Sequence, residues 1–225
     1  WGKKSLPGVK AAEYRLTSKG EGRPQVYSFC MCPGGVIVPA TAVADANIVN
    51  GMSKYLRSNK FANAACVATL NIGNMLKRDV SALEALDWME GIENSFFEFS
   101  KGYKAPTCSI TDFINKKITN NDTNTSYPLG VIEAPLWELL PSEVETAMRE
   151  GLKDFIKKMK GFETGNIMGL ESKTSSPIQV DRYKNGLCSG FANLYVIGEG
   201  SGFAGGIISS AADGIKSALD LISQL

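Results

Sequence analysis

The chain has 225 residues, of which 44% are hydrophobic and 21% are charged, a composition typical of a folded globular protein. Its 24 basic and 23 acidic residues leave a net charge of +1, so we expect no nucleic-acid partner. Histidine is absent, which excludes Ser–His and Cys–His nucleophiles, histidine general bases and histidine-ligated zinc.

The sequence also bears on location and cross-linking. No apolar stretch approaches the roughly 20 residues that a membrane span needs, and we recognise no signal-peptide pattern. The five cysteines are odd in number and include no C-x-x-C pair. We therefore expect a cytoplasmic protein with no disulfide scaffold, no metal site and no membrane span.

The first third of the chain is rich in β-forming residues. Strands are predicted at 13–18, 25–32 and 35–41, with a turn at Pro33, Gly34 and Gly35, because glycine tolerates positive φ and proline ends a ladder. A run of small apolar residues at 62–70 predicts a further, buried strand.

Two amphipathic helices are predicted next. Ser81 and Glu84 have the spacing of a capping box, and Ser142 begins the second helix, which ends at Gly161. Apolar residues at helical spacing predict a core-facing stripe on each: Leu83, Leu86, Met89, Ile92, Phe96 and Phe99 on the first, and Val144, Met148, Leu152, Phe155 and Met159 on the second. A polar run at 119–126 predicts a solvated loop between them.

The C-terminal segment combines a predicted strand, a glycine-rich turn and a helix. The apolar run at 193–197 predicts a strand buried on both faces, and helical periodicity begins at Ile208. Gly200, Gly202 and Gly205 fit G-x-G-x-x-G by letter, but no second strand follows to complete a dinucleotide-binding unit. Two interpretations stay open: the turn contacts a ligand through its backbone amides, or it only packs helix against strand.

Four motifs in order carry a family resemblance. They are SFCMCPGG at 28–35, NGMS at 50–53, ESKTSSP at 171–177 and GEGSGFAGGI at 198–207. Together they resemble the C-terminal portion of bacterial FAD-dependent dehydrogenases, the NAD(FAD)-utilising dehydrogenases, over nearly the whole chain. In that family two separated parts of the polypeptide build the flavin domain. The resemblance implies that an N-terminal FAD-binding segment is missing here, which also accounts for the abrupt start at Trp1.

The resemblance further implies a set of cofactor contacts. The turn would lie against FAD, with Glu199 accepting a ribityl hydroxyl hydrogen bond and the backbone amides of 204–207 facing the polar edge of the flavin. The expected contacts are Gly198, Glu199, Gly200, Ser201, Gly202, Ala204, Gly205, Gly206 and Ile207. NAD(P)H is a candidate electron partner, and the substrate is expected to be a small molecule.

Other residues are candidates for catalysis or substrate binding, and each also has a purely structural explanation. Cys30 and Cys32 form C-x-C on a predicted strand, so both thiols are expected to point the same way as a redox pair or beside a flavin. The favoured alternative makes them small core residues next to a turn. Ser175 and Ser176, with Arg182, are candidates for the substrate side, and a capped bend is the equal alternative.

These observations predict a fold class and an organisation. We expect an α/β chain with an α+β substrate domain, forming the C-terminal part of a two-part FAD-binding flavoprotein fold with a helical insertion. The predicted parts are a β-rich region at 1–75, the insertion at 76–160, return strands at 161–186, and the last strand and helix of the FAD domain at 187–225. The chain alone is expected to be inactive and to bind FAD weakly or not at all. The alternative is a non-catalytic binding module whose glycine turn serves packing.

Overall fold

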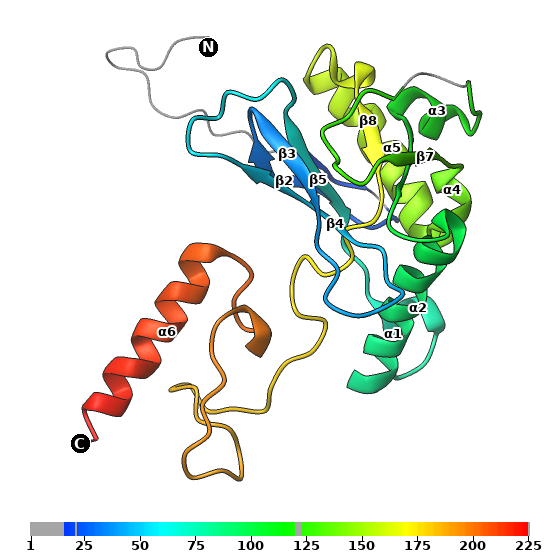
Figure 1. Cartoon of the computed structure of the whole chain (residues 1–225). Coiled ribbons are helices and arrows are strands. Elements are labelled where there is room, and N and C mark those ends of the chain that lie inside the picture. The colour runs from blue at the N-terminus through cyan, green and yellow to red at the C-terminus, as the bar shows by residue number, and fades with distance from the viewer. Residues whose placement is uncertain (1–15, 21, 120–122, 225) are drawn as a thin grey trace. The chain divides into compact units, whose positions relative to one another are not determined.

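The computed structural model describes residues 16–20, 22–119 and 123–224 (Figure 1). Within them the fold is mixed α/β, with three small sheets and six α-helices. The chain divides into two compact units that alternate along the sequence. The first comprises Trp1–Val38, Asn50–Leu70 and Thr107–Met168, and the second comprises Pro39–Val49, Asn71–Pro106 and Gly169–Leu225. The helical insertion and the four-part division stay predictions.

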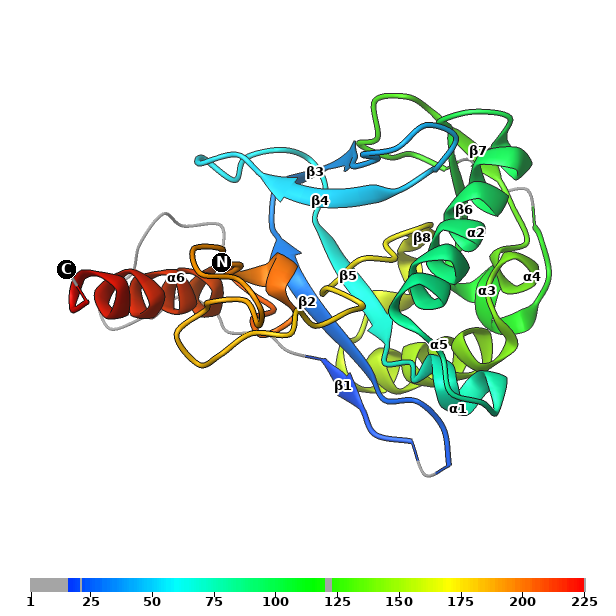
Figure 2. The same ribbon diagram turned by 90° about the horizontal axis from the view of Figure 1, so that it is seen from below.

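The first unit is built on an antiparallel sheet in the order β1-β2-β5. Its strands are β1 (Thr17–Ser18), β2 (Val26–Cys32) and β5 (Asn63–Ala68), and Figure 2 shows β2 and β5 side by side. The other pairings join β3 (Gly35–Pro39) to β4 (Val49–Ser53), and β6 (Ala105–Ser109) to β7 (Val131–Glu133) and β8 (Asn166–Met168). The strands predicted at 25–32, 35–41 and 62–70 are present. Residues 13–15 of the strand predicted at 13–18 lie outside the described residues.

Helix α5 (Ser142–Lys158) packs on this sheet and supplies much of the core of the first unit. The smaller helices are α3 (Ile110–Asn115), α4 (Leu136–Leu139) and the 3-10 turn η1 (Phe162–Thr164). Met148, Leu152 and Phe155 are buried as predicted, whereas Met159 is exposed because α5 ends one residue before it. The helix begins at Ser142, but the N-cap position belongs to Pro141 and has no side-chain hydrogen bond.

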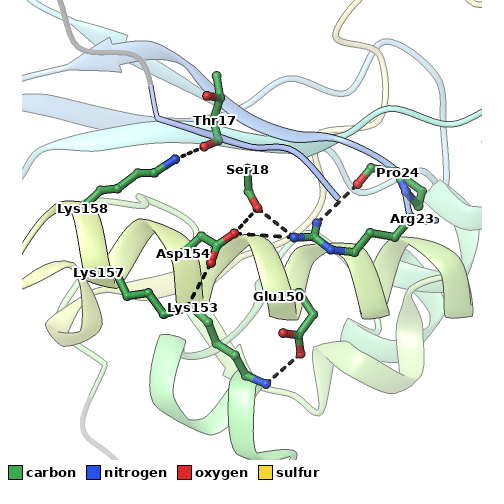
Figure 3. A network of polar contacts seen from close by, with 9 residues as sticks. All are labelled: Thr17, Ser18, Arg23, Pro24, Glu150, Lys153, Asp154, Lys157 and Lys158. Carbon is green, nitrogen blue, oxygen red and sulfur yellow. Dashed lines mark hydrogen bonds and ion pairs between the residues drawn. The ribbon is translucent and has the colours of Figure 1, made fainter. Parts of the chain in front are cut away.

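A polar network links α5 to the β1–β2 hairpin (Figure 3). The Ser18 hydroxyl donates to Asp154 at 2.5 Å, and Arg23 donates to Ser18 at 2.8 Å while lying 3.6 Å from Asp154. The Ser18 hydrogen bond holds the pKa of Asp154 below its usual range. Lys158 donates to the carbonyl of Thr17. The network therefore fixes the first strand of the sheet against the helix.

In the second unit, α2 (Ala82–Ser100) begins with the predicted capping box. The Ser81 hydroxyl accepts the Glu84 amide at 3.3 Å, and the Glu84 carboxylate accepts the Ser81 amide at 2.9 Å. Met89 and Phe96 are buried as predicted, but Leu83 is 72% exposed, so the stripe begins one turn later. The other helices are α1 (Ile72–Leu76), the 3-10 turn η2 (Glu199–Ser201) and α6 (Ile207–Ile222).

The prediction of a strand at 193–197 is wrong. This segment makes one isolated bridge, between Tyr195 and Leu187, and no described strand pairs with it. A strand buried on both faces needs neighbouring strands to pair with and other elements packed over its two faces. Without such neighbours the run stays irregular, with Leu194 and Ile197 each 41% exposed. The turn and the helix after it are present.

Candidate functional site

The glycine turn occupies residues 198–206 and leads directly into α6. Gly198 and Gly202 have φ of 75° and 80°, the left-handed region that favours glycine. At Gly202 a Cβ would also collide with the carbonyl oxygen of Ile178. This glycine is therefore required by close packing, whatever else the turn does.

The outer side of the turn is open. Among the residues that the structure describes, no heavy atom beyond the chain neighbours lies within 4 Å of the position a Cβ would take at Gly200, and at Gly205 the nearest is the Ser175 Cβ at 4.0 Å. Gly206 is the N-cap residue of α6 and provides no side-chain cap, and the first turn of the helix carries no acidic residue. The amides at the start of this 16-residue helix thus have no side-chain cap at the positive end of its dipole.

A salt bridge holds the turn against α6. Arg182 donates two hydrogen bonds of 3.0 Å to Asp213, and Asp213 also accepts the Gly198 amide at 2.8 Å. The Arg182 guanidinium and the Gly198 amide together hold the pKa of Asp213 below its usual range. Arg182 stacks over the Phe203 ring at 4.3 Å and has a side chain only 5% exposed. The turn is therefore pre-organised before any ligand binds.

The expected cofactor-contact residues differ in what they present. Glu199 is exposed, whereas Ser201 and Ala204 are buried. The Ser201 hydroxyl donates to the Gly198 carbonyl at 2.6 Å, and its carbonyl accepts the Val180 amide at 3.0 Å. Ser201 and Ala204 are thus placed to shape the turn, while Glu199 and the open glycines face outward.

The substrate-side candidates are partly brought to the turn. Ser175 lies next to Gly205, and the Ser176 hydroxyl donates to the Ile178 carbonyl at 2.8 Å, as a capped bend would. Arg182 uses its guanidinium for Asp213 and for the Val196 carbonyl at 3.1 Å. A substrate role for these three residues stays a prediction.

The C-x-C pair does not have the strand geometry on which its redox interpretation was based. A bulge interrupts the β2–β5 register between Phe29 and Cys32, and Cys30 has a φ of 48°. The two-residue alternation of side chains therefore fails at this point, and Cys30 is exposed while Cys32 is half-buried. None of the five cysteines is in a disulfide, and burial raises the pKa of the Cys108 thiol to about 12.

Sequence reasoning missed a buried acid that anchors the ESKTSSP segment. Glu93, fully buried on α2, accepts the Ser172 hydroxyl at 2.5 Å and pairs with the Lys173 ammonium at 3.0 Å. Burial raises the pKa of the adjacent Glu171 from 4.5 to about 7. One signal in the sequence could have found this buried acid. Glu93 lies between Ile92 and Phe96 of the apolar stripe, and an acid on the buried face of a helix needs a partner for its charge.

Metal ligands and membrane spans are two further features to consider in the part of the chain that the structure describes. No three acidic or cysteine side chains in this part of the chain gather where they could hold a metal ion. None of its helices has both the length and the apolarity that crossing a bilayer requires. The open glycines and uncapped helix start, in contrast, fit an extended anionic cofactor lying against the turn.

Comparisons with known proteins place the chain in a family of FAD-dependent proteins. A family model described as FAD-dependent protein, C-terminal domain-like, matches residues 1–174. An uncharacterized protein of Clostridium beijerinckii is 38% identical over 224 residues, which is 97% of this chain and 42% of that relative. The chain thus spans less than half the length of this relative, and the family match ends before the glycine turn.

Proposed function

Because the chain belongs to the FAD-dependent proteins that share this C-terminal domain, we propose that it is part of a flavoprotein oxidoreductase and that its glycine turn contacts FAD. One observation carries the proposal: the open, pre-organised backbone at Gly200, Gly205 and Gly206, where α6 begins. When bound, FAD supplies the electron transfer, and the chain supplies the surface that binds and orients it.

The proposed contacts use backbone more than side chains. Amides of 204–207 would donate to the polar edge of the flavin, where negative charge develops on reduction, and the helix dipole favours that charge. Glu199 is exposed beside them and would accept a ribityl hydroxyl. Asp213 and Arg182 would act through the turn, because they hold Gly198 in place without facing outward.

The proposal also covers the substrate, the electron partner and the location of the protein. Ser175, next to Gly205, is the best-placed substrate-side candidate for a small molecule. Dehydrogenase activity and NAD(P)H as electron partner rest on the motif resemblance alone. A cytoplasmic location is supported by five cysteines outside disulfides.

The proposal includes an N-terminal FAD-binding segment as partner. The Clostridium relative carries 58% of its length outside the matched region, so it has room for such a segment. In this chain α6 presents strongly exposed apolar residues, namely Ile207, Ile208, Ile215, Leu219 and Ile222. We propose that the N-terminal segment covers this face and completes the flavin site.

Gly205→Val in the full-length gene product tests the flavin contact. Among the described residues, a Cβ at this position would meet only the Ser175 Cβ, at 4.0 Å, so folding is expected to be retained. The added methyls would occupy the space proposed for FAD, and at least a tenfold drop in bound flavin per protein is expected by absorbance. Gly91→Val is the matched control, because Gly91 on α2 is equally free of neighbours.

Three results would count against the proposal. A full-length gene product without flavin would refute it outright. Unchanged flavin content in Gly205→Val would support the packing-only binding module instead. A 225-residue chain that is purified with stoichiometric FAD would show that no N-terminal segment is needed.

A further inference from the structure

The first unit contains a pocket far from the glycine turn in sequence. Its volume is about 690 Å³, within the range of about 300–1,000 Å³ of small-molecule sites. Four segments line it: β3, the two residues before β5, α3 with the described part of the loop that follows it as far as Ser126, and the η1–β8 region. All its lining residues lie within the first unit and within the residues that the family model matches.

The wall of the pocket has an apolar side and a polar side. Ile37, Phe61, Ala62 and Met168 form the apolar side. The polar side is dominated by neutral groups, six hydroxyls and three carboxamides: Ser109, Thr111, Thr119, Thr125, Ser126, Thr164, Asn115, Asn124 and Asn166. Such a wall can pack a flat C–H surface while it hydrogen-bonds the edge of the same ligand.

Local hydrogen bonds orient several of these hydroxyls. Ser109, Thr125 and Ser126 each accept a backbone amide, at 2.9, 3.2 and 3.0 Å, so each keeps its proton to donate. Thr111 and Thr164 donate to backbone carbonyls, at 3.4 and 2.7 Å, so they keep lone pairs to accept. The pocket thus offers donors and acceptors together, the pattern that ligand hydroxyl groups match.

Its charges do not favour an anion. Asp112 is 3% exposed and is bound by the Thr119 hydroxyl at 2.8 Å, and Glu163 accepts the Gly161 amide at 3.0 Å. Lys117 is the single cationic residue among those described around the pocket. Phosphate and carboxylate ligands usually meet several cations or an arginine fork, which this wall does not provide.

We propose that this pocket binds a neutral polyhydroxylated compound with a sugar-like ring. The ring's C–H face lies on Ile37, Phe61 and Met168, and its hydroxyls bond to the polar side. This site is independent of the proposed flavin contact, since it uses none of the residues of the turn.

Saturation-transfer NMR and calorimetry on the 225-residue chain without added flavin test the site. The probes are glucose, ribose and myo-inositol, with gluconate as the anionic control. At least one neutral probe is expected to bind. Asn115→Ala and Asn166→Ala are each expected to weaken it about fivefold, the effect of one lost hydrogen bond. Both side chains are exposed and make no hydrogen bond to another described residue, so folding is expected to persist.

Asn74→Ala is the matched control, because Asn74 is an exposed asparagine on α1 outside the pocket. Three outcomes would overturn the proposal: no binding by any of the neutral probes, tighter binding of gluconate than of glucose, or equal effects of the pocket variants and the control. None of these outcomes depends on flavin content, so failure here leaves the flavin proposal to its own test.

Discussion

Glu171 gives the second unit a pH dependence whose sign follows from burial. An unfolded glutamate ionises near pH 4.5, whereas the pKa of Glu171 is raised to about 7. Between those values folding takes up a proton, so the stability of the chain falls as pH rises. Glu171→Gln removes this cost. It is expected to raise the free energy of unfolding by about 1–2 kcal/mol near pH 8, since solvent still reaches part of the side chain, and to change little near pH 4.

Urea unfolding at both pH values measures the effect, with Glu90→Gln, an exposed site on α2, as control. An equal gain at the two pH values would mean that ionisation of Glu171 is not its cause. The neighbouring Glu93 is different, because its ion pair with Lys173 spans 80 positions of the sequence. Pairings of this kind, like that of Arg182 with Asp213, depend on the tertiary fold and leave no local pattern.

The helices and strands show the same distinction: some depend on residues close together in the sequence, and others depend on tertiary contacts. The capping box at Ser81 and the α5 stripe depend on residues three or four positions apart, so the sequence predicted them. The strand expected at 193–197 needed neighbouring strands, which the described residues do not provide, and the bulge at Cys30 depends on the pairing of β2 with β5. The pocket combines four segments, none of which carries a recognisable motif. The glycine turn was predicted because it depends on a run of consecutive residues, which the sequence shows directly.

Two helical glycines provide a matched test of how α5 meets the sheet. Gly→Ala in a helix usually stabilises by about 1 kcal/mol, which is expected for Gly91→Ala on α2 because nothing lies near its Cβ position. At Gly151 a Cβ would come within 2.7–2.9 Å of the buried Val26 side chain. Gly151→Ala is therefore expected to lower the free energy of unfolding by about 1–3 kcal/mol. Thermal and urea unfolding measure both, and stabilisation by Gly151→Ala would show that helix and sheet pack less closely than described.

The molecule as a whole combines a family domain at 1–174 with a C-terminal turn and helix that the family match does not include. Each carries its own candidate site: the polar pocket in the first unit and the glycine turn in the second. The residues that line the pocket all belong to its own unit. The turn is open, and the helix after it shows an apolar face, so only the second site calls for a partner to complete it.

That difference predicts that the same double substitution on α6 affects the 225-residue chain little and destabilises the full-length gene product. Ile215 and Leu219 are 62% and 63% exposed, so Ile215→Lys with Leu219→Lys is expected to change the stability of the 225-residue chain by less than about 0.5 kcal/mol per site. In the full-length gene product these side chains are proposed to be buried, and losing that burial costs about 1.5–3 kcal/mol each. A lower melting temperature and loss of flavin are therefore expected there, measured by calorimetry and absorbance. Leu83→Lys, 72% exposed on α2, should be neutral in both. If the full-length protein tolerates the double change, α6 is not the surface that the N-terminal segment covers.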